Sequence, residues 1–240
     1  MNFYKDVHLS WLNHQLKQQV DKVGRENYWY SLWDEPRNLT EAYINAICRK
    51  YIPYGFEGVE YWYYKSPDGH VYNGFHFDKD ELAEGYVPPH QVAVIQLDFD
   101  DSCVVVSDMT WGQDIPKDLT YVYGDEGRLT IFDGKYAYSE MIGAPNSVTL
   151  YLNIWLRHKP IGIERCPYTE EWEPFDHCLL PKTETSMVEY TGPLSTSTQD
   201  CGDTHQMYYM KQPAEYVIGD TLYVPNGVVD YCEWHTVSYK

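Results

Sequence analysis

A histidine and an aspartate two positions apart are the residues of this sequence best suited to chemistry. His76 and Asp78 alternate with Phe75 and Phe77, as residues do at the end of a β-strand. Side chains at positions i and i+2 of a strand share a face, so an imidazole and a carboxylate can converge on one ion. They are two of the ligands of a two-His, one-carboxylate facial triad, which holds non-haem Fe(II) and leaves positions open for oxygen and substrate. The spacing therefore predicts oxygen chemistry.

The His-x-Asp spacing needs support from other parts of the sequence, because nine His and 36 acidic residues produce it by chance. Several blocks stand around it in one order: EYW (60–62), GFHFDKDE (74–81), QVAVIQL (91–97), GRLTIFDG (127–134) and VTLYLNIW (148–155), with KP at 159–160. Together they resemble the 2-oxoglutarate and Fe(II)-dependent dioxygenase superfamily, most closely its prolyl-hydroxylase-like branch. The resemblance covers about residues 30–162. It implies a double-stranded β-helix, or jelly roll, with Fe(II) at its open mouth and 2-oxoglutarate as co-substrate.

Two positions depart from the pattern of that family. The resemblance places the second histidine ligand at a position that is Tyr138 here, and the arginine that pairs with 2-oxoglutarate at a position that is Ser147. A tyrosine binds iron strongly only after losing a proton whose usual pKa is about 10. A serine hydroxyl replaces a charge-assisted hydrogen bond worth about 1.5–3 kcal/mol. Loose iron and weak 2-oxoglutarate binding are therefore expected.

Other residues are candidates for the third metal ligand. Glu140 shares a strand face with Tyr138 and offers a second carboxylate. A histidine from the C-terminal part of the chain, His177 or His205, is the other possibility. The alternatives of Tyr138, Glu140, a C-terminal histidine or no third ligand stay open on the sequence alone.

Lys65 is the best candidate for the missing co-substrate clamp. It ends a strand-like run, and a lysine can pair with a carboxylate as a point charge. Arg157 has the same parity as Ser147, but ten strand residues would carry it about 33 Å away.

Two functions follow from these residues. The first is a non-haem iron oxygenase that hydroxylates a small molecule or peptide side chain, with the metal on His76 and Asp78 and with Tyr138 and Glu140 at the reacting centre. The second is a catalytically altered or inactive protein of the same fold, which binds a ligand or partner in a tyrosine-lined cavity. A metal enzyme that does not use 2-oxoglutarate lies between them.

The residue pattern predicts an α+β, mainly β, single domain. Apolar residues recur at helical spacing over 8–24 and 38–51, and short β-branched or aromatic runs follow at 58–65, 92–98, 103–108, 127–132 and 148–156. We expect residues 1–55 to form a helical support behind the sheet, 56–162 to form the core, and 163–240 to form an extension or lid.

The composition excludes several classes of partner. A formal net charge of -18 disfavours nucleic acid. No apolar run approaches the ~20 residues of a membrane span, and the N-terminus lacks a secretory pattern. The six cysteines form no Cys-x-x-Cys pair, and reduced thiols in the cytoplasm are expected. The expected partner is a small-molecule or peptide substrate, and the oligomeric state is not predicted.

Overall fold

Two antiparallel sheets make up most of the protein in this computed structural model. It describes residues 2–4, 10–52, 55–66, 71–98, 103–113, 119–123, 127–142 and 144–175, and then only the strand residues 189–190, 198–200, 206–211, 216–218, 221–223 and 230–235. The first sheet has six strands in the order β1 (Asn2–Tyr4), β8 (Arg128–Asp133), β5 (Gln91–Gln96), β10 (Val148–Trp155), β3 (Gly58–Lys65) and β2 (Tyr28–Ser31). The second has five, in the order β11 (Glu189–Tyr190), β7 (Leu119–Tyr123), β6 (Cys103–Thr110), β9 (Tyr136–Ile142) and β4 (Val71–His76).

The path of the chain through these sheets is that of a jelly roll. From β3 to β10, successive strands alternate between the two sheets, except that β6 and β7 form a hairpin within the second. The strands before and after this hairpin pair with each other. In the first sheet β5 pairs with β8, and in the second sheet β9 pairs with both β6 and β4. Eight antiparallel strands in two sheets of this kind define the fold. The predicted mainly β jelly roll is confirmed.

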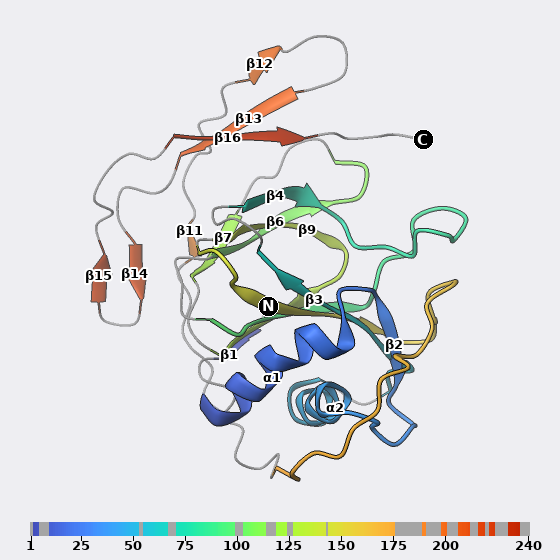
Figure 1. The fold of residues 1–240 in the computed structure, drawn as a ribbon. Coiled ribbons are helices and arrows are strands. Elements are labelled where there is room, and N and C mark those ends of the chain that lie inside the picture. Colours follow the sequence, from blue (N-terminus) through green and yellow to red (C-terminus); the bar gives the residue numbers. More distant parts are fainter. Residues whose placement is uncertain are drawn as a thin grey trace.

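The helices α1 (Ser10–Val23) and α2 (Leu39–Tyr51) lie on one side of the six-stranded sheet (Figure 1). Asn38 caps α2, because its side-chain oxygen accepts the backbone N–H of Glu41 at 2.9 Å. Leu12 and Leu16 of α1 and Ile44 and Ile47 of α2 are buried in one cluster with residues of the sheet. We call this cluster the outer core.

The opposite face of the six-stranded sheet packs against the five-stranded sheet and forms an inner core. Its fully buried members are Val92, Val94, Val104, Val106, Val122, Phe132, Tyr138 and Tyr151. The alternation along β10 explains the division, because Leu150 and Leu152 belong to the outer core and Tyr151 to the inner one. Every residue of β10 is buried, as is expected for a strand covered on both faces.

Beyond residue 175 the described part of the chain consists of short strands. β12 (Thr198–Asp200), β13 (Gln206–Lys211) and β16 (Asp230–His235) form a three-stranded sheet, and β14 (Tyr216–Ile218) pairs with β15 (Thr221–Tyr223). His177 and His205, proposed as metal ligands, lie outside the described residues. The role of residues 163–240 as a lid stays a prediction.

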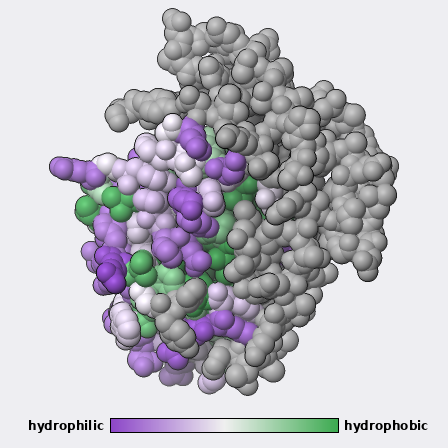
Figure 2. All heavy atoms as spheres, turned by 180° about the vertical axis from the view of Figure 1, so that it is seen from behind, coloured by the Kyte–Doolittle hydropathy of each residue, from purple (hydrophilic) through white to green (hydrophobic). Residues whose placement is uncertain are grey.

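On the face shown in Figure 2, the coloured part of the surface is largely hydrophilic, with hydrophobic areas between the hydrophilic ones. Among the described residues, no helix has the length and apolar character needed to cross a membrane.

Candidate functional site

Three predicted site residues meet where β4 and β9 lie side by side. His76 is the last residue of β4, and it pairs in register with Tyr138 of β9. One extra residue in β4 between positions 73 and 76 shifts this register, and such bulges re-aim side chains beside functional sites. The rings of His76 and Tyr138 are 4.3 Å apart between centroids. Two residues further on, Asp78 approaches both of them.

Asp78 is the centre of a hydrogen-bonded group. The Tyr138 hydroxyl donates to Asp78 Oδ2 at 2.9 Å, and His76 Nε2 lies 3.8 Å from Asp78 Oδ1. The side chain of Asp78 is 12% exposed and that of His76 is 40% exposed, so the imidazole is on the solvent side of the carboxylate. The structure thus brings together an accessible imidazole, a buried carboxylate and a buried phenol.

Burial determines the protonation of this group. Burial raises the pKa of the Asp78 carboxyl above its ordinary value, and the electrostatic interaction with His76 and the hydrogen bonds from Tyr138 and Asn153 counteract only part of that effect. Burial, followed by the negative charge of Asp78, raises the pKa of Tyr138 well above 10. Tyr138 is therefore a neutral phenol whose hydroxyl donates a hydrogen bond to Asp78.

A second carboxylate lies behind Asp78, and the sequence analysis did not identify it. Glu60 of β3 is 6% exposed and accepts hydrogen bonds from Asn27 Nδ2 at 2.8 Å and Asn153 Nδ2 at 3.5 Å. Burial raises the pKa of Glu60, and the charge of Asp78 contributes to the increase. The alternation of residues along the strands could have indicated its position. Glu60 alternates with residues of the outer core, and Asn153 lies on the same face of its strand as Tyr151 of the inner core.

The predicted alternative ligand Glu140 lies two residues along β9 from Tyr138, and its role as a metal ligand stays a prediction. It is 3% exposed, pairs in register with Asn73 and Val104, and accepts a hydrogen bond from the hydroxyl of Tyr151. It therefore belongs to the inner core.

The donor set does not fit a facial-triad iron. Within the described residues, no three His, Cys, Asp or Glu side chains are arranged to hold a metal ion. The third position is Tyr138, whose proton is held by burial and by Asp78. Among the described residues at this position, one imidazole and one carboxylate remain, which is one ligand fewer than the triad requires.

The two residues predicted at the co-substrate clamp are placed elsewhere. Lys65 follows the outer-core parity of Tyr61 and Tyr63, and its Nζ lies 4.0 Å from Asp21 Oδ1 on α1. Lys65 therefore lies on the helix side of the sheet, and its role in place of the arginine stays a prediction. Ser147 directly precedes β10, but its hydroxyl donates to the backbone oxygen of Ala144 at 2.8 Å. Neither residue offers a positive charge beside Asp78.

Three aromatic rings follow His76 along the mouth of the jelly roll, and we call them the rim cluster: Phe77, Tyr86 and Trp111. The Tyr86 and Trp111 rings are stacked with centroids 4.6 Å apart, and Phe77 meets both edge-on at 5.9 and 5.6 Å. Trp111 is 47% exposed. The sequence analysis missed this cluster because residue 111 is far from the other two along the chain.

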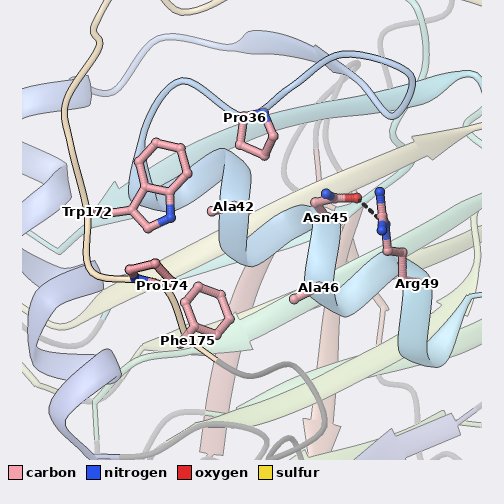
Figure 3. A pocket seen from close by; sticks show the side chains of 8 residues that line it. All are labelled: Pro36, Ala42, Asn45, Ala46, Arg49, Trp172, Pro174 and Phe175. Atoms are coloured by element: carbon pink, nitrogen blue, oxygen red, sulfur yellow. Dashed lines mark hydrogen bonds between the residues drawn. The ribbon is translucent and has the colours of Figure 1, made fainter.

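A separate hollow of about 170 Å³ lies on the helix side of the six-stranded sheet (Figure 3). It is lined by residues of α2 and of the segment around Trp172: Pro36, Ala42, Asn45, Ala46, Arg49, Trp172, Pro174 and Phe175. In it, Arg49 Nε donates to Asn45 Oδ1 at 2.9 Å. The sheet separates this hollow from His76.

Comparison with known proteins finds similarity in solved structures only. No protein-family model matches this sequence, and no curated protein sequence matches it. A prolyl-4-hydroxylase from Pseudomonas putida is 16% identical with a TM-score of 0.45, over 65% of this chain and 87% of that chain. A viral collagen prolyl hydroxylase from Paramecium Bursaria Chlorella virus-1 is 14% identical with a TM-score of 0.38, over 63% and 87%. HygX from Streptomyces hygroscopicus, solved with iron bound, is 9% identical with a TM-score of 0.37, over 65% and 83%. All three TM-scores are below 0.5, so any functional conclusion must come from the residues of the site.

Proposed function

We propose that the protein binds a small molecule or a peptide side chain at His76 and Asp78, and that it does so without an iron held by a facial triad. The observation that carries the proposal is the hydrogen bond from Tyr138 to Asp78. In an iron site, the carboxylate and the third ligand would both direct lone pairs at the metal. Here the third residue directs a proton at the carboxylate.

The free energy of deprotonation opposes a switch of Tyr138 to a metal ligand. Even for an unperturbed tyrosine, losing the proton at pH 7 costs about 4 kcal/mol, from three pKa units at about 1.4 kcal/mol each. Burial and the charge of Asp78 add to this cost, because they raise the pKa of Tyr138 further. The imidazole of His76 is 40% exposed and the carboxylate of Asp78 lies behind it, so a ligand that arrives from solvent meets both groups.

Restoring the missing ligand tests the proposal. The wild type, Tyr138→His and the double variant Tyr138→His/His76→Ala should be titrated anaerobically with Fe(II), with metal stoichiometry measured after gel filtration. We expect no stoichiometric iron in the wild type, about one equivalent in Tyr138→His, and loss of that iron in the double variant. Thermal unfolding followed by circular dichroism controls for folding.

The proposal fails if the wild type retains one equivalent of Fe(II) that His76→Ala abolishes. It also fails if Tyr138→His folds and gains no iron, because Tyr138 would then not be the group that prevents the triad.

Oxidation at iron is the second candidate function, favoured by the proximity of His76 Nε2 and Asp78 Oδ1 at 3.8 Å. It would require a third donor for the metal and a positive group for 2-oxoglutarate. Its signature is succinate formation from 2-oxoglutarate by the wild type, measured in the same iron titration.

A further inference from the structure

The rim cluster already receives a positive charge from the protein itself. The ammonium of Lys79 lies 5.6 Å from the centroid of the Trp111 ring, within the range of a cation–π interaction. Its other neighbour is Glu81, whose Oε2 is 3.5 Å away, and that side chain is 74% exposed. The aromatic surface beside the site is therefore suited to an ammonium group, and the long side chain of Lys79, 30% exposed, supplies one there.

The second feature beside the site is the hydroxyl group of Tyr86. Its oxygen is buried, and it has no hydrogen-bond partner among the described residues. Burial and then the negative charges of Asp78 and Asp133 raise the pKa of Tyr86 to about 12, so this oxygen lies within the electrostatic field of Asp78. Buried hydroxyls are rarely left unsatisfied, and a ligand group beside Asp78 would satisfy this one.

Negative charge favours a cation as that ligand, both from the carboxylates beside the mouth and from the chain as a whole. The carboxylates of Asp78 and Glu60 lie close enough behind the mouth for the negative charge of Asp78 to raise the pKa of Glu60. Asp133 adds a further negative charge near Tyr86. The chain as a whole carries a formal net charge of -18, which attracts cations and repels anions at long range.

We propose that the ligand carries an alkylammonium group, whose N–H groups donate to Asp78 and to the Tyr86 oxygen while its carbon chain packs against the rim cluster. This inference rests on the proposed function and adds the chemical class of the ligand. In the bound state the ligand displaces the ammonium of Lys79 from the Trp111 ring.

Three probes of similar size and different charge test the class: n-butylammonium, n-butanol and butyrate. Binding should be followed by NMR titration of the His76 ring protons and the Trp111 indole N–H, assigned through His76→Ala and Trp111→Leu. We expect n-butylammonium to shift these signals with an affinity about tenfold or more above that of n-butanol, as a hydrogen bond to a charged group implies, and butyrate to have no effect.

Variants that keep the fold intact locate the interaction. Tyr86→Phe removes only the hydroxyl and should weaken n-butylammonium about tenfold, whereas Lys79→Ala should strengthen it because the competing ammonium is gone. Trp111→Leu should weaken binding, and Trp33→Leu, at a tryptophan that is 80% exposed, is the matched control and should leave it unchanged.

Two results would overturn the inference separately from the proposed function. If n-butanol or butyrate binds as tightly as n-butylammonium and is equally sensitive to Tyr86→Phe, the mouth binds ligands but the ammonium class is wrong. If none of the probes shifts the His76 and Trp111 signals, the inference is wrong as well, while the iron titration still decides whether the site is a metal centre.

Discussion

Tyr138 supplies a buried carboxylate with a neutral hydrogen-bond donor, and the proposed function rests on this single hydroxyl. Glu60 and Asn153 extend the polar group inward, so Asp78 is held from below as well as from the side. Buried polar groups of this kind are stable only when their hydrogen bonds are satisfied.

Tyr138→Phe should destabilise the protein. The change removes the hydrogen bond to Asp78 and leaves that carboxylate with one donor fewer, at a cost of about 1–3 kcal/mol in the free energy of unfolding. Urea denaturation followed by fluorescence measures the difference. Tyr136→Phe, on the same strand and face but only partly buried, should change the free energy by less than about 0.5 kcal/mol. Equal effects of the two changes would contradict the role given to the Tyr138 hydroxyl.

The i, i+2 spacing predicted that His76 and Asp78 lie together, because it fixes a shared strand face wherever the strand lies, and the structure places them side by side. Tyr138 was named from the family resemblance, and the role of these residues as a site stays a prediction. The resemblance did not establish which face of its strand Lys65 lies on, and the structure places this side chain on the helix side of the sheet. Trp111 could not be found either, because its contacts with Tyr86 depend on long-range folding.

At the scale of elements, an ion pair between Arg165 and the buried Glu41 links the segment after β10 to α2. Arg165 donates from Nε to Glu41 Oε1 at 3.1 Å and from Nη2 to Oε2 at 2.6 Å. Glu41 is fully buried, and it also accepts the backbone N–H of Arg37 at 2.8 Å. The fork geometry of this pair suits arginine and not lysine.

Arg165→Ala should cost about 3–5 kcal/mol in the free energy of unfolding, because it leaves the Glu41 carboxylate buried without its counter-charge. Urea midpoints for the variant and wild type measure it. The control is Lys135→Ala, which breaks a half-exposed pair with Asp133 and should cost less than about 1 kcal/mol. If Arg165→Ala lowers the free energy of unfolding by no more than the control does, the Arg165–Glu41 ion pair does not stabilise the fold.

Glu170 makes this same segment sensitive to acid. Burial alone would raise its pKa, but hydrogen bonds from Tyr168, Lys22 and the backbone of Leu39 hold the pKa below its ordinary value of 4.5. A carboxyl whose pKa is lowered by folding stabilises the protein above its unfolded-state pKa, and this contribution is lost as the pH falls through the folded-state value.

Glu170→Gln should therefore lower Tm at pH 7, and the difference from wild type should shrink as the pH falls below 4.5. Thermal unfolding of both proteins across the pH range measures this. A difference that does not depend on pH would mean that packing, and not charge, explains the loss.

The elements themselves were largely predictable. Helices expected at 8–24 and 38–51 are found at 10–23 and 39–51, and the expected strands correspond to β3, β5, β6, β8 and β10. Short strands such as β2 were missed, because four residues at the edge of a sheet carry too little alternation to be recognised. The order of strands within the sheets depends on pairings between distant residues and was not predicted, and the jelly roll itself was implied by the family resemblance and not by the residue pattern.

At the scale of the whole molecule, the chain has 36 acidic and 18 basic residues. Repulsion among the unpaired negative charges therefore destabilises the folded state. Raising NaCl from about 10 to about 150 mM should raise Tm, because the screening length falls from about 30 to about 8 Å. Calorimetry at both salt concentrations measures the shift. The same comparison near the isoelectric point of about 4.7 should give a smaller shift, and an equal shift would indicate that salt acts by another route.

Strand β10 has a consequence for how the chain is made. It lies between β3 and β5 in the finished sheet, yet it is synthesised after both. Until about residue 155 has left the ribosome, the strands on either side of that gap expose unpaired backbone edges with apolar side chains, the kind of surface that associates with other chains. Nascent chains of this protein should therefore depend on chaperones until β10 is available, and premature termination before it should yield aggregates and not a smaller folded domain.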